Sequence, residues 1–385
     1  MNVGLMATAL IVQVGAADTL VVRTTSETWS LNPREASRVG SIDGPSETSF
    51  GYVSSVLGAA DGTTFVADSQ VPVVRVFSPD GEYLNDIGRK GQGPGEYEGI
   101  FGVAFSPDRE VVVWDYNTRR VSYFRPDGTF ERSFATELKG VSYGRGSLLV
   151  GQDGTVRLLT PADPSMYEQS SRPREAVIGW MQYRPDGSVT DSLIPPRREV
   201  SGSYNAFKLE TASAVAPDGT LVSGRNSEYA LHRQLADGRV VRIERPYESV
   251  RLERDERQQW ATHQAEWERR WAFESPDIPE TKPAWRQLIV DAAGRIWVHR
   301  YSAAVHRPGY STPSAERGGW PAVEWVEPVV FDLLDPRGQY LGSISLGDGT
   351  EFAYSVGNWL WVVERGEFDE AYVVRYAIEP RSGAD

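Results

Sequence analysis

Six polar residues occupy equivalent places in the sequence, each six positions after a short turn motif: Asp68, Asp115, Gln152, Arg225, Arg300 and Glu364. A guanidinium group can bind a carboxylate or a sulfate through two parallel hydrogen bonds, whereas carboxylates bind amines and metal cations. If these side chains face one opening, they predict a site for a small anionic or zwitterionic ligand. The alternative is that they pair with one another or with nearby backbone groups, as buried charges must.

Two families of turns define the repeating unit that would position these residues. The first family comprises Asp61-Gly62, Asp108-Arg109, Arg145-Gly146, Asp218-Gly219, Ala293-Gly294 and Gly357-Asn358. The second comprises Pro79-Asp80-Gly81, Pro126-Asp127-Gly128, Pro185-Asp186-Gly187, Ala236-Asp237-Gly238 and Pro336-Arg337-Gly338. Pro, Asp and Gly favour tight turns, and the intervening runs are short and rich in Val, Phe, Tyr and Trp. Each unit is therefore expected to form four antiparallel strands, A to D.

Six such units predict an all-β fold, a six-bladed β-propeller. The spacing between the two turns is 19 residues in three units, from Gly62 to Gly81, from Arg109 to Gly128 and from Gly219 to Gly238. The last unit lacks a fourth strand. Because an open ring would leave unpaired strand edges, we expect the segment around Ser37–Asp43 to supply the outer strand of the last blade.

The segment Phe65–Gly99 and the stretch from Lys282 to Val298 resemble bacterial exported six-bladed β-propeller proteins with NHL-like repeats. The connector Gly88-Arg89-Lys90-Gly91-Gln92-Gly93-Pro94-Gly95-Glu96-Tyr97 is typical of that group. Its glycines lack the spacing of a phosphate-binding loop, so we interpret it as a passage between blades. The resemblance implies the fold and little about function, because propellers carry many activities.

Two functions remain open under this resemblance. The first is a binding or interaction module without catalysis, whose ligand lies at the channel mouth on the face of the B–C and D–A loops. The second is a Ca²⁺-assisted hydrolase or lyase of the propeller lactonase type, in which Asp68, Asp115 and Glu364 would hold the metal. That match is by charge alone. No cofactor is otherwise predicted, and no catalytic motif points to an enzyme.

Long insertions are predicted on the same face as the polar residues. They are about Thr155–Gly179, Tyr301–Glu327 and the connector between blades 4 and 5. In that connector, residues 249–275 carry Trp260, Trp267 and Trp271 at helical spacing, which predicts a helical insertion. The tryptophan stripe packs the helix onto the propeller or forms a platform for a sugar or a partner protein.

The remaining segments concern export. Residues 1–17 form an uncharged apolar run that ends in small residues, which is typical of a signal peptide and too short to span a bilayer. We therefore expect a periplasmic or extracellular protein, with a lead-in segment at 18–36, the propeller at 37–380 and a tail at 381–385.

The formal net charge of −13 argues against nucleic-acid partners. There are no cysteines and only four histidines, so thiolate metal sites and disulfides are excluded.

Overall fold

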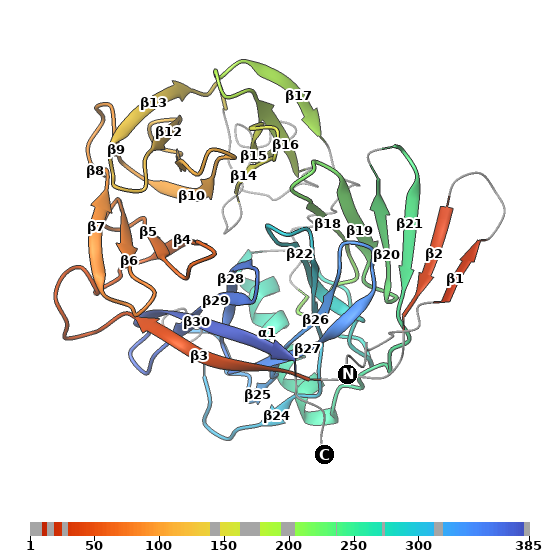
Figure 1. Cartoon of the computed structure of the whole chain (residues 1–385). Coiled ribbons are helices and arrows are strands. Elements are labelled where there is room, and N and C mark those ends of the chain that lie inside the picture. The colour runs from red at the N-terminus through yellow and green to blue at the C-terminus, as the bar shows by residue number, and fades with distance from the viewer. Residues whose placement is uncertain are drawn as a thin grey trace, which may run out of the picture.

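Short turns built on aspartate and glycine connect the strands. In the first blade Asp61 accepts the N–H of Thr63 at 2.9 Å, and Gly62 takes a φ of +98°, a region that favours glycine. The resulting hairpins build four-stranded antiparallel sheets that are arranged as a closed ring (Figure 1). The prediction of a six-bladed β-propeller is confirmed in this computed structural model.

The structure describes residues 10–13, 19–24, 30–138, 147–161, 178–193, 205–235, 237–271, 274–311 and 319–380. Blade 1 contains β4 (Val53–Gly58), β5 (Thr64–Asp68), β6 (Val73–Phe77) and β7 (Tyr83–Ile87). Blade 2 contains β10 (Ile100–Phe105), β11 (Val111–Asp115), β12 (Arg120–Phe124) and β13 (Phe130–Ala135). Blade 3 contains β14 (Leu148–Val150), β15 (Val156–Pro161), β16 (Ile178–Tyr183) and β17 (Val189–Leu193).

Blade 4 contains β18 (Thr211–Val215), β19 (Leu221–Arg225), β20 (Ala230–Gln234) and β21 (Val240–Glu244). Blade 5 contains β22 (Trp285–Val290), β23 (Ile296–Arg300), β26 (Val329–Leu334) and β27 (Tyr340–Leu346). Blade 6 contains β28 (Glu351–Val356), β29 (Trp359–Arg365), β30 (Ala371–Pro380) and, as its outer strand, β3 (Leu31–Val39). The first strand of each blade lies innermost.

The ring closes through the N-terminal segment, as predicted. Strand β3 runs antiparallel to β30, with Ser37 opposite Arg375 and Val39 opposite Val373. The strand occupies Leu31–Val39 and not Ser37–Asp43, because Gly40 takes a φ of +132° and the chain turns away there. The prediction for the closing strand therefore had the correct blade and the wrong bounds.

The register of blade 3 also differs from the prediction. Its first turn lies at Gly151–Gly154, where Thr155 N–H donates to Asp153 at 3.0 Å and Gly154 has a φ of +78°. The predicted turn, Arg145-Gly146, lies outside the described residues. Asp153-Gly154 has the aspartate that stabilises such a turn, and Arg145-Gly146 does not.

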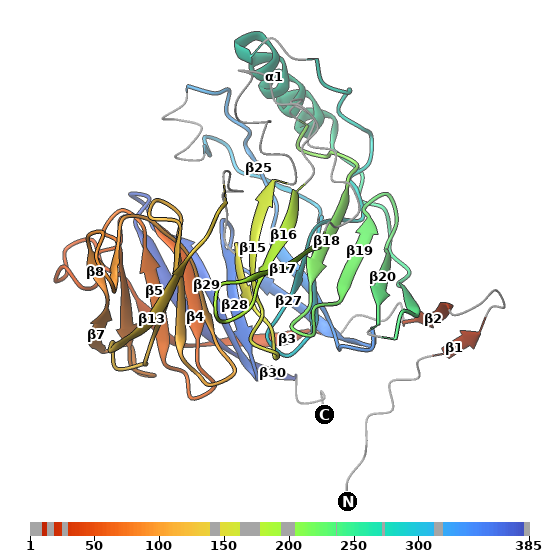
Figure 2. The same ribbon diagram turned by 90° about the horizontal axis from the view of Figure 1, so that it is seen from above.

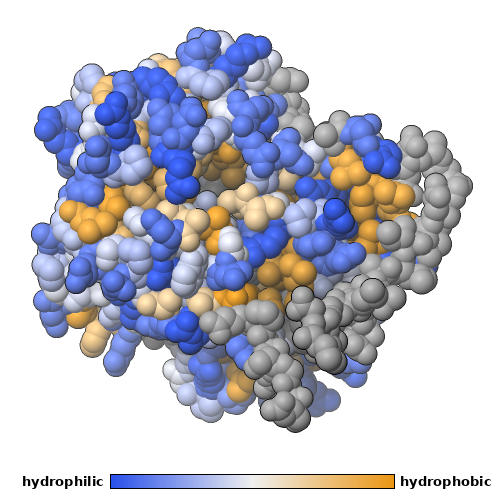
Figure 3. All heavy atoms as spheres, in the orientation of Figure 1, coloured by the Kyte–Doolittle hydropathy of each residue, from blue (hydrophilic) through white to orange (hydrophobic). Residues whose placement is uncertain are grey.

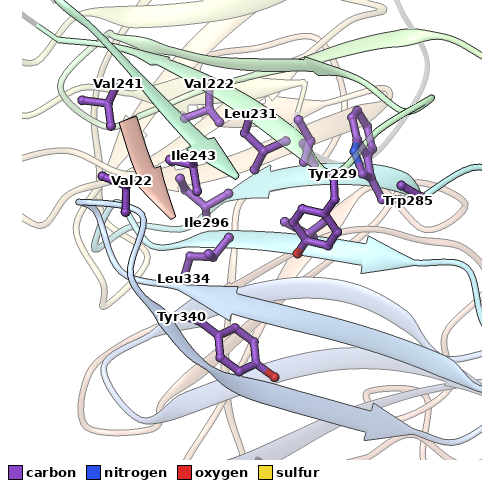
Figure 4. Close-up of a cluster of buried hydrophobic side chains, with 13 residues drawn as sticks. Val22, Val222, Tyr229, Leu231, Val241, Ile243, Trp285, Ile296, Leu334 and Tyr340 are labelled. Atoms are coloured by element: carbon purple, nitrogen blue, oxygen red, sulfur yellow. The ribbon is translucent and has the colours of Figure 1, made fainter. Parts of the chain in front are cut away.

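The apolar core lies between adjacent blades. Between blades 4 and 5 it contains Val222, Leu231, Trp285 and Ile296, all with 0% exposure (Figure 4). Strand β2 (Thr19–Arg23) pairs in parallel with β21, and Val22 packs into this same cluster. Strand β1 (Leu10–Gln13) pairs with β2 and comes from the run predicted as a signal peptide, whose removal stays a prediction.

The loops give the two faces of the ring different shapes. Helix α1 (Arg254–Trp271) and the strand pair β24 (Val305–His306) and β25 (Trp325–Val326) rise from one face, here called the top face (Figure 2). The helical insertion between blades 4 and 5 is thus confirmed. Strands β8 (Arg89–Lys90) and β9 (Glu96–Tyr97) pair within the glycine-rich connector between blades 1 and 2. Among the described residues, no helix is both long and apolar enough to cross a membrane.

Candidate functional site

Asp68 ends the second strand of blade 1 and is fully buried. It accepts four backbone N–H groups at 2.8 to 3.2 Å, from Gly51, Tyr52, Gln70 and Val71. Its carboxylate also lies 3.4 Å from the guanidinium of Arg75. These contacts fix the loop before the blade to the loop after β5, so Asp68 stabilises loops, as the structural alternative proposed.

Asp115 has the same surroundings in blade 2. It is 1% exposed and accepts N–H groups at 2.7 to 3.2 Å from Glu98, Gly99, Asn117 and Thr118. Both carboxylates therefore have their oxygens engaged by the backbone of their own blade. A ligand would have to displace those bonds to reach them.

Glu364 binds across the strands of blade 6. It accepts from Tyr376 at 2.8 Å and from Arg38 at 2.8 Å, which joins β29 to β30 and β3. The three acids of the metal interpretation thus each have partners in their own blades. Within the described part of the chain, no group of three His, Asp or Glu side chains is placed to hold a metal ion.

Gln152 and Arg225 do not join the other four. Gln152 lies in the first turn of blade 3, on the face opposite the top face, because the register of that blade differs from the prediction. Arg225 ends β19 on the top face and is exposed, and its side chain has no partner among the described residues. The six residues therefore do not form one ring, and their role in binding stays a prediction.

Arg300 lies in a charged cluster between blades 4 and 5. Its Nε is 3.0 Å from Asp332 Oδ1, and Asp332, on β26, has 0% exposure. The other carboxylate oxygen, Oδ2, is 3.2 Å from Nε of Arg245, which follows the outer strand of blade 4. Two guanidinium groups thus share one buried carboxylate.

Hydroxyl groups complete the surroundings of Asp332. Tyr229 donates to Oδ2 at 3.0 Å, Ser343 donates to Oδ1 at 2.5 Å, and the Tyr340 hydroxyl lies 2.7 Å from that of Ser343. Burial raises the pKa of Tyr229 well above its usual range, and burial also raises the pKa of Tyr340. Both phenols therefore stay protonated at neutral pH and can donate hydrogen bonds.

A pocket of about 600 Å³ lies over this cluster on the top face. Arg300 is partly open to it, with 30% of its side chain exposed, while the side chain of Arg245 is 4% exposed and lies 3.7 Å from the ring of Tyr340. The lining residues are Tyr229, Arg245, Pro246, Tyr247, Glu248, Val250, Arg300, Tyr301, Ser302 and Ala303. A partly exposed guanidinium at the base and aromatic walls suit a small acid.

Sequence reasoning identified Arg300 and missed Arg245 and Asp332. The six equivalent positions were all assigned to the ends of second strands, whereas Arg245 follows the fourth strand of blade 4. An arginine placed directly between a strand and Pro246 was the available signal. Asp332 gave none, because it stands within the apolar run of β26.

The helix above this pocket is held by a second buried charged cluster. Lys282 Nζ has no exposed side-chain surface and lies 2.7 Å from Glu256 of α1 and 3.1 Å from Glu327. Trp260 packs edge-on against Phe207, with ring centroids 5.7 Å apart. Trp267 stacks on Trp320, in the long loop of blade 5, with ring centroids 5.5 Å apart. Trp260 and Trp267 thus attach the helix to the neighbouring loops.

Comparison with known proteins supports the fold. A family model described as a six-bladed β-propeller, DUF5128, matches residues 43–135, which contain blades 1 and 2. No protein of curated function matches the sequence. A member of the DUF4221 family from Bacteroides vulgatus has a TM-score of 0.54 and 11% identity, over 92% of this chain and 99% of that chain.

Two further solved structures resemble the chain more distantly. A candidate exported protein from Bacteroides fragilis has 11% identity and a TM-score of 0.48, over 94% of this chain and 99% of that chain. A gluconolactonase from Xanthomonas campestris has 15% identity and a TM-score of 0.41, over 95% and 100%. At such identities the likeness concerns the fold alone. The family match over blades 1 and 2 thus agrees with the six-bladed β-propeller that the structure shows.

Proposed function

We propose that this propeller is a binding module for a small ligand that carries a carboxylate or a sulfate, bound in the pocket between blades 4 and 5. The observation that carries the proposal is the sharing of Asp332 by Arg245 and Arg300, with Arg300 open to the pocket. The exposed part of the Arg300 guanidinium would bind the carboxylate or sulfate of the ligand.

The pocket lies on the predicted face but beside the channel mouth. Arg300 has its Nε against Asp332, so its terminal nitrogens remain to bind a ligand oxygen. The exposed carboxylate of Glu248 on the pocket wall would accept an amine, which makes an amino acid or another zwitterion compatible with the site.

Calorimetric titration with succinate, sulfate and glycine tests this proposal. Binding of at least one probe should weaken by about ten- to a hundredfold in Arg300→Gln, since a charge-assisted contact is lost. Arg225→Gln is the matched control, because Arg225 also ends a second strand on the top face and lies outside this pocket. Equal loss in both variants, or loss only in Arg225→Gln, would place the ligand at the channel mouth instead.

The hydrolase or lyase alternative needs a metal held by Asp68, Asp115 and Glu364. No contact of these residues favours it, because each carboxylate binds groups of its own blade. Calcium addition tests it independently: a rise in melting temperature at millimolar Ca²⁺ would support the alternative. The third interpretation is a scaffold whose helix α1 binds another protein, and deletion of residues 255–271 should then remove that binding.

We also propose that the protein acts outside the cytoplasm. Support comes from the uncharged apolar run of residues 3–17, its small residues Gly15-Ala16-Ala17 and the following Asp18. N-terminal sequencing of the protein recovered from the periplasm or medium of a bacterial host should begin at or near Asp18. Recovery of the uncleaved chain in the cytoplasm alone would contradict this.

A further inference from the structure

The centre of the ring contains a second cavity, distinct from the pocket between blades 4 and 5. It measures about 310 Å³, is lined by the innermost strands of all six blades and includes the first turns of blades 2 to 5. It therefore opens on the face opposite α1, where the ring is hollowed between its innermost strands (Figure 3). None of its lining residues belongs to the pocket over Asp332.

The wall of this channel is mostly apolar. Leu57, Phe105, Leu149, Phe352 and Tyr354 line it, and all but Leu57 are only partly buried by the protein. Apolar side chains that remain open to a cavity gain free energy when a ligand covers them. The channel thus suits the apolar part of a small molecule.

One cation lies at the bottom rim of the channel. Arg157, on β15, is 6% exposed and lines the cavity, and its Nε donates to the neutral side chain of Gln182 at 3.0 Å. Its terminal nitrogens lie beside the turn glycines of blades 3 and 4, where a Cβ on Gly151 or Gly219 would come within 2.5 and 2.7 Å of them. Arg157 makes no ion pair with any described residue.

The acids nearest to Arg157 are engaged elsewhere. Asp153 accepts from the backbone and hydroxyl of Thr155, at 3.0 and 2.8 Å. Asp218 accepts from Thr220 in the same way and lies 3.5 Å from Arg233. Burial lowers the pKa of Arg157 and outweighs the opposing effect of Asp153 and Asp218, neither of which forms an ion pair with it.

Arg233 shows what a purely structural arginine does between two blades. It donates to the carbonyl oxygens of Gly294 at 3.3 Å and Pro336 at 2.5 Å, in the turns of the following blade. The terminal nitrogens of Arg157 lie beside the turns of blades 3 and 4 but make no such bond with the described residues, and Arg157 also lines the cavity.

We propose that the channel binds an amphipathic carboxylate, such as a short fatty acid, with its carboxylate on Arg157 and its chain among the apolar residues of the inner strands. Both halves of the ligand are required. The guanidinium supplies a charge-assisted, bidentate contact, and the channel wall removes the chain from water. Among the described residues, no carboxylate forms an ion pair with Arg157, so the carboxylate of a ligand in the cavity would supply one.

Titration with octanoate, acetate and 1-octanol tests the proposal by calorimetry on the full chain. Octanoate should bind saturably, and both acetate and 1-octanol should bind at least about tenfold more weakly. Arg157→Gln should weaken octanoate binding by about ten- to a hundredfold. Arg233→Gln, the matched control, should lower the melting temperature and leave octanoate affinity unchanged.

Two further variants separate this proposal from the site over Asp332. Arg300→Gln should leave octanoate affinity unchanged, and Arg157→Gln should leave succinate or sulfate binding unchanged. If Arg157→Gln does not fold, Arg157→Lys keeps the charge and should retain octanoate binding with reduced affinity. Absence of saturable octanoate binding to the unmodified protein, equal affinity for 1-octanol, or unchanged binding in Arg157→Gln would each overturn the proposal.

Discussion

Replacing Asp332 by asparagine should destabilise the propeller strongly. The side chain has 0% exposure, and it is the carboxylate shared by Arg245 at 3.2 Å and Arg300 at 3.0 Å. An amide has no charge, so the nearly buried guanidinium of Arg245 would lose the ion pair with Asp332. Removing one partner from a buried ion pair costs about 3–5 kcal/mol, because the remaining charge stays desolvated.

The magnitude can be converted into a melting temperature. An unfolding entropy of about 2.1 cal/mol/K per residue over 385 residues gives about 0.8 kcal/mol/K, so we expect Asp332→Asn to lower Tm by about 4–6 °C. The control is Glu35→Gln, which breaks the ion pair with Arg38 at 2.9 Å, where the side chains are 44% and 37% exposed. An exposed pair contributes less than about 1 kcal/mol, so its Tm should change by about 1 °C or less.

The same variant makes an opposite prediction for binding. Removing the carboxylate makes the formal charge beside the pocket more positive by one unit, so sulfate should bind more tightly to Asp332→Asn than to the unmodified protein. Sulfate should also restore part of the lost Tm by binding the folded state. Differential scanning calorimetry with and without sulfate measures both effects. A Tm within 1 °C of the unmodified protein, or weaker sulfate binding, would contradict this role of Asp332.

Three further predictions follow from single positions. Burial lowers the pKa of His299 to about 3, whereas its pKa in the unfolded chain is about 6.5. Between these two values only the unfolded chain binds a proton at His299. The free energy of unfolding should therefore fall by about 2 kcal/mol between pH 7 and pH 5. Urea denaturation should show this fall reduced in His299→Phe, and an unchanged pH dependence in that variant would contradict it. Gly62→Ala should lower the free energy of unfolding by well over 1 kcal/mol, because φ is +98° and the added Cβ would lie 1.5 Å from an arginine of the neighbouring blade. Gly349→Ala is the control: its φ is +70° and nothing lies within 4 Å of the added Cβ, so the loss should be about 1 kcal/mol. Lys282→Met should leave Glu256 buried and unpaired and loosen α1, which limited proteolysis within the helix would detect, and equal cleavage of both proteins would count against this role.

The repeat was readable from the sequence because its determinants are local. An aspartate that accepts an N–H two residues later, followed by a glycine with positive φ, appears directly in the sequence at Asp61-Gly62 and Asp218-Gly219. Where the motif was absent, as at Arg145-Gly146, the register of blade 3 was wrong, and Gln152 was assigned to the wrong face. The predicted number of blades was still correct, because the other turns determine it.

The pocket could not be read in the same way, because its contacts join residues that are distant in the chain. Asp332 is 87 residues from Arg245 and 103 from Tyr229. Which residues of blade 4 meet which residues of blade 5 depends on how the two sheets pack, and no local pattern encodes that packing. The sequence predicted an arginine on the correct face and in the correct blade, and the structure supplied its partners.

The six equivalent positions differ in role because only some of their side chains can accept hydrogen bonds from loop N–H groups. In blades 1 and 2 the aspartate at the end of the second strand accepts loop N–H groups, but an arginine has no acceptor. In blade 4 this role passes to Asn226, which accepts the N–H of Glu210 at 2.8 Å. In blade 5, Glu327 accepts the N–H of Ser302 at 3.1 Å. A substitute acceptor close to each arginine leaves that arginine unnecessary for the loops, and Arg300 alone of the two lies over a buried carboxylate beside a pocket. A variant that removes the substitute, such as Asn226→Leu, should therefore destabilise the loops of blade 4 without changing anion binding over Asp332.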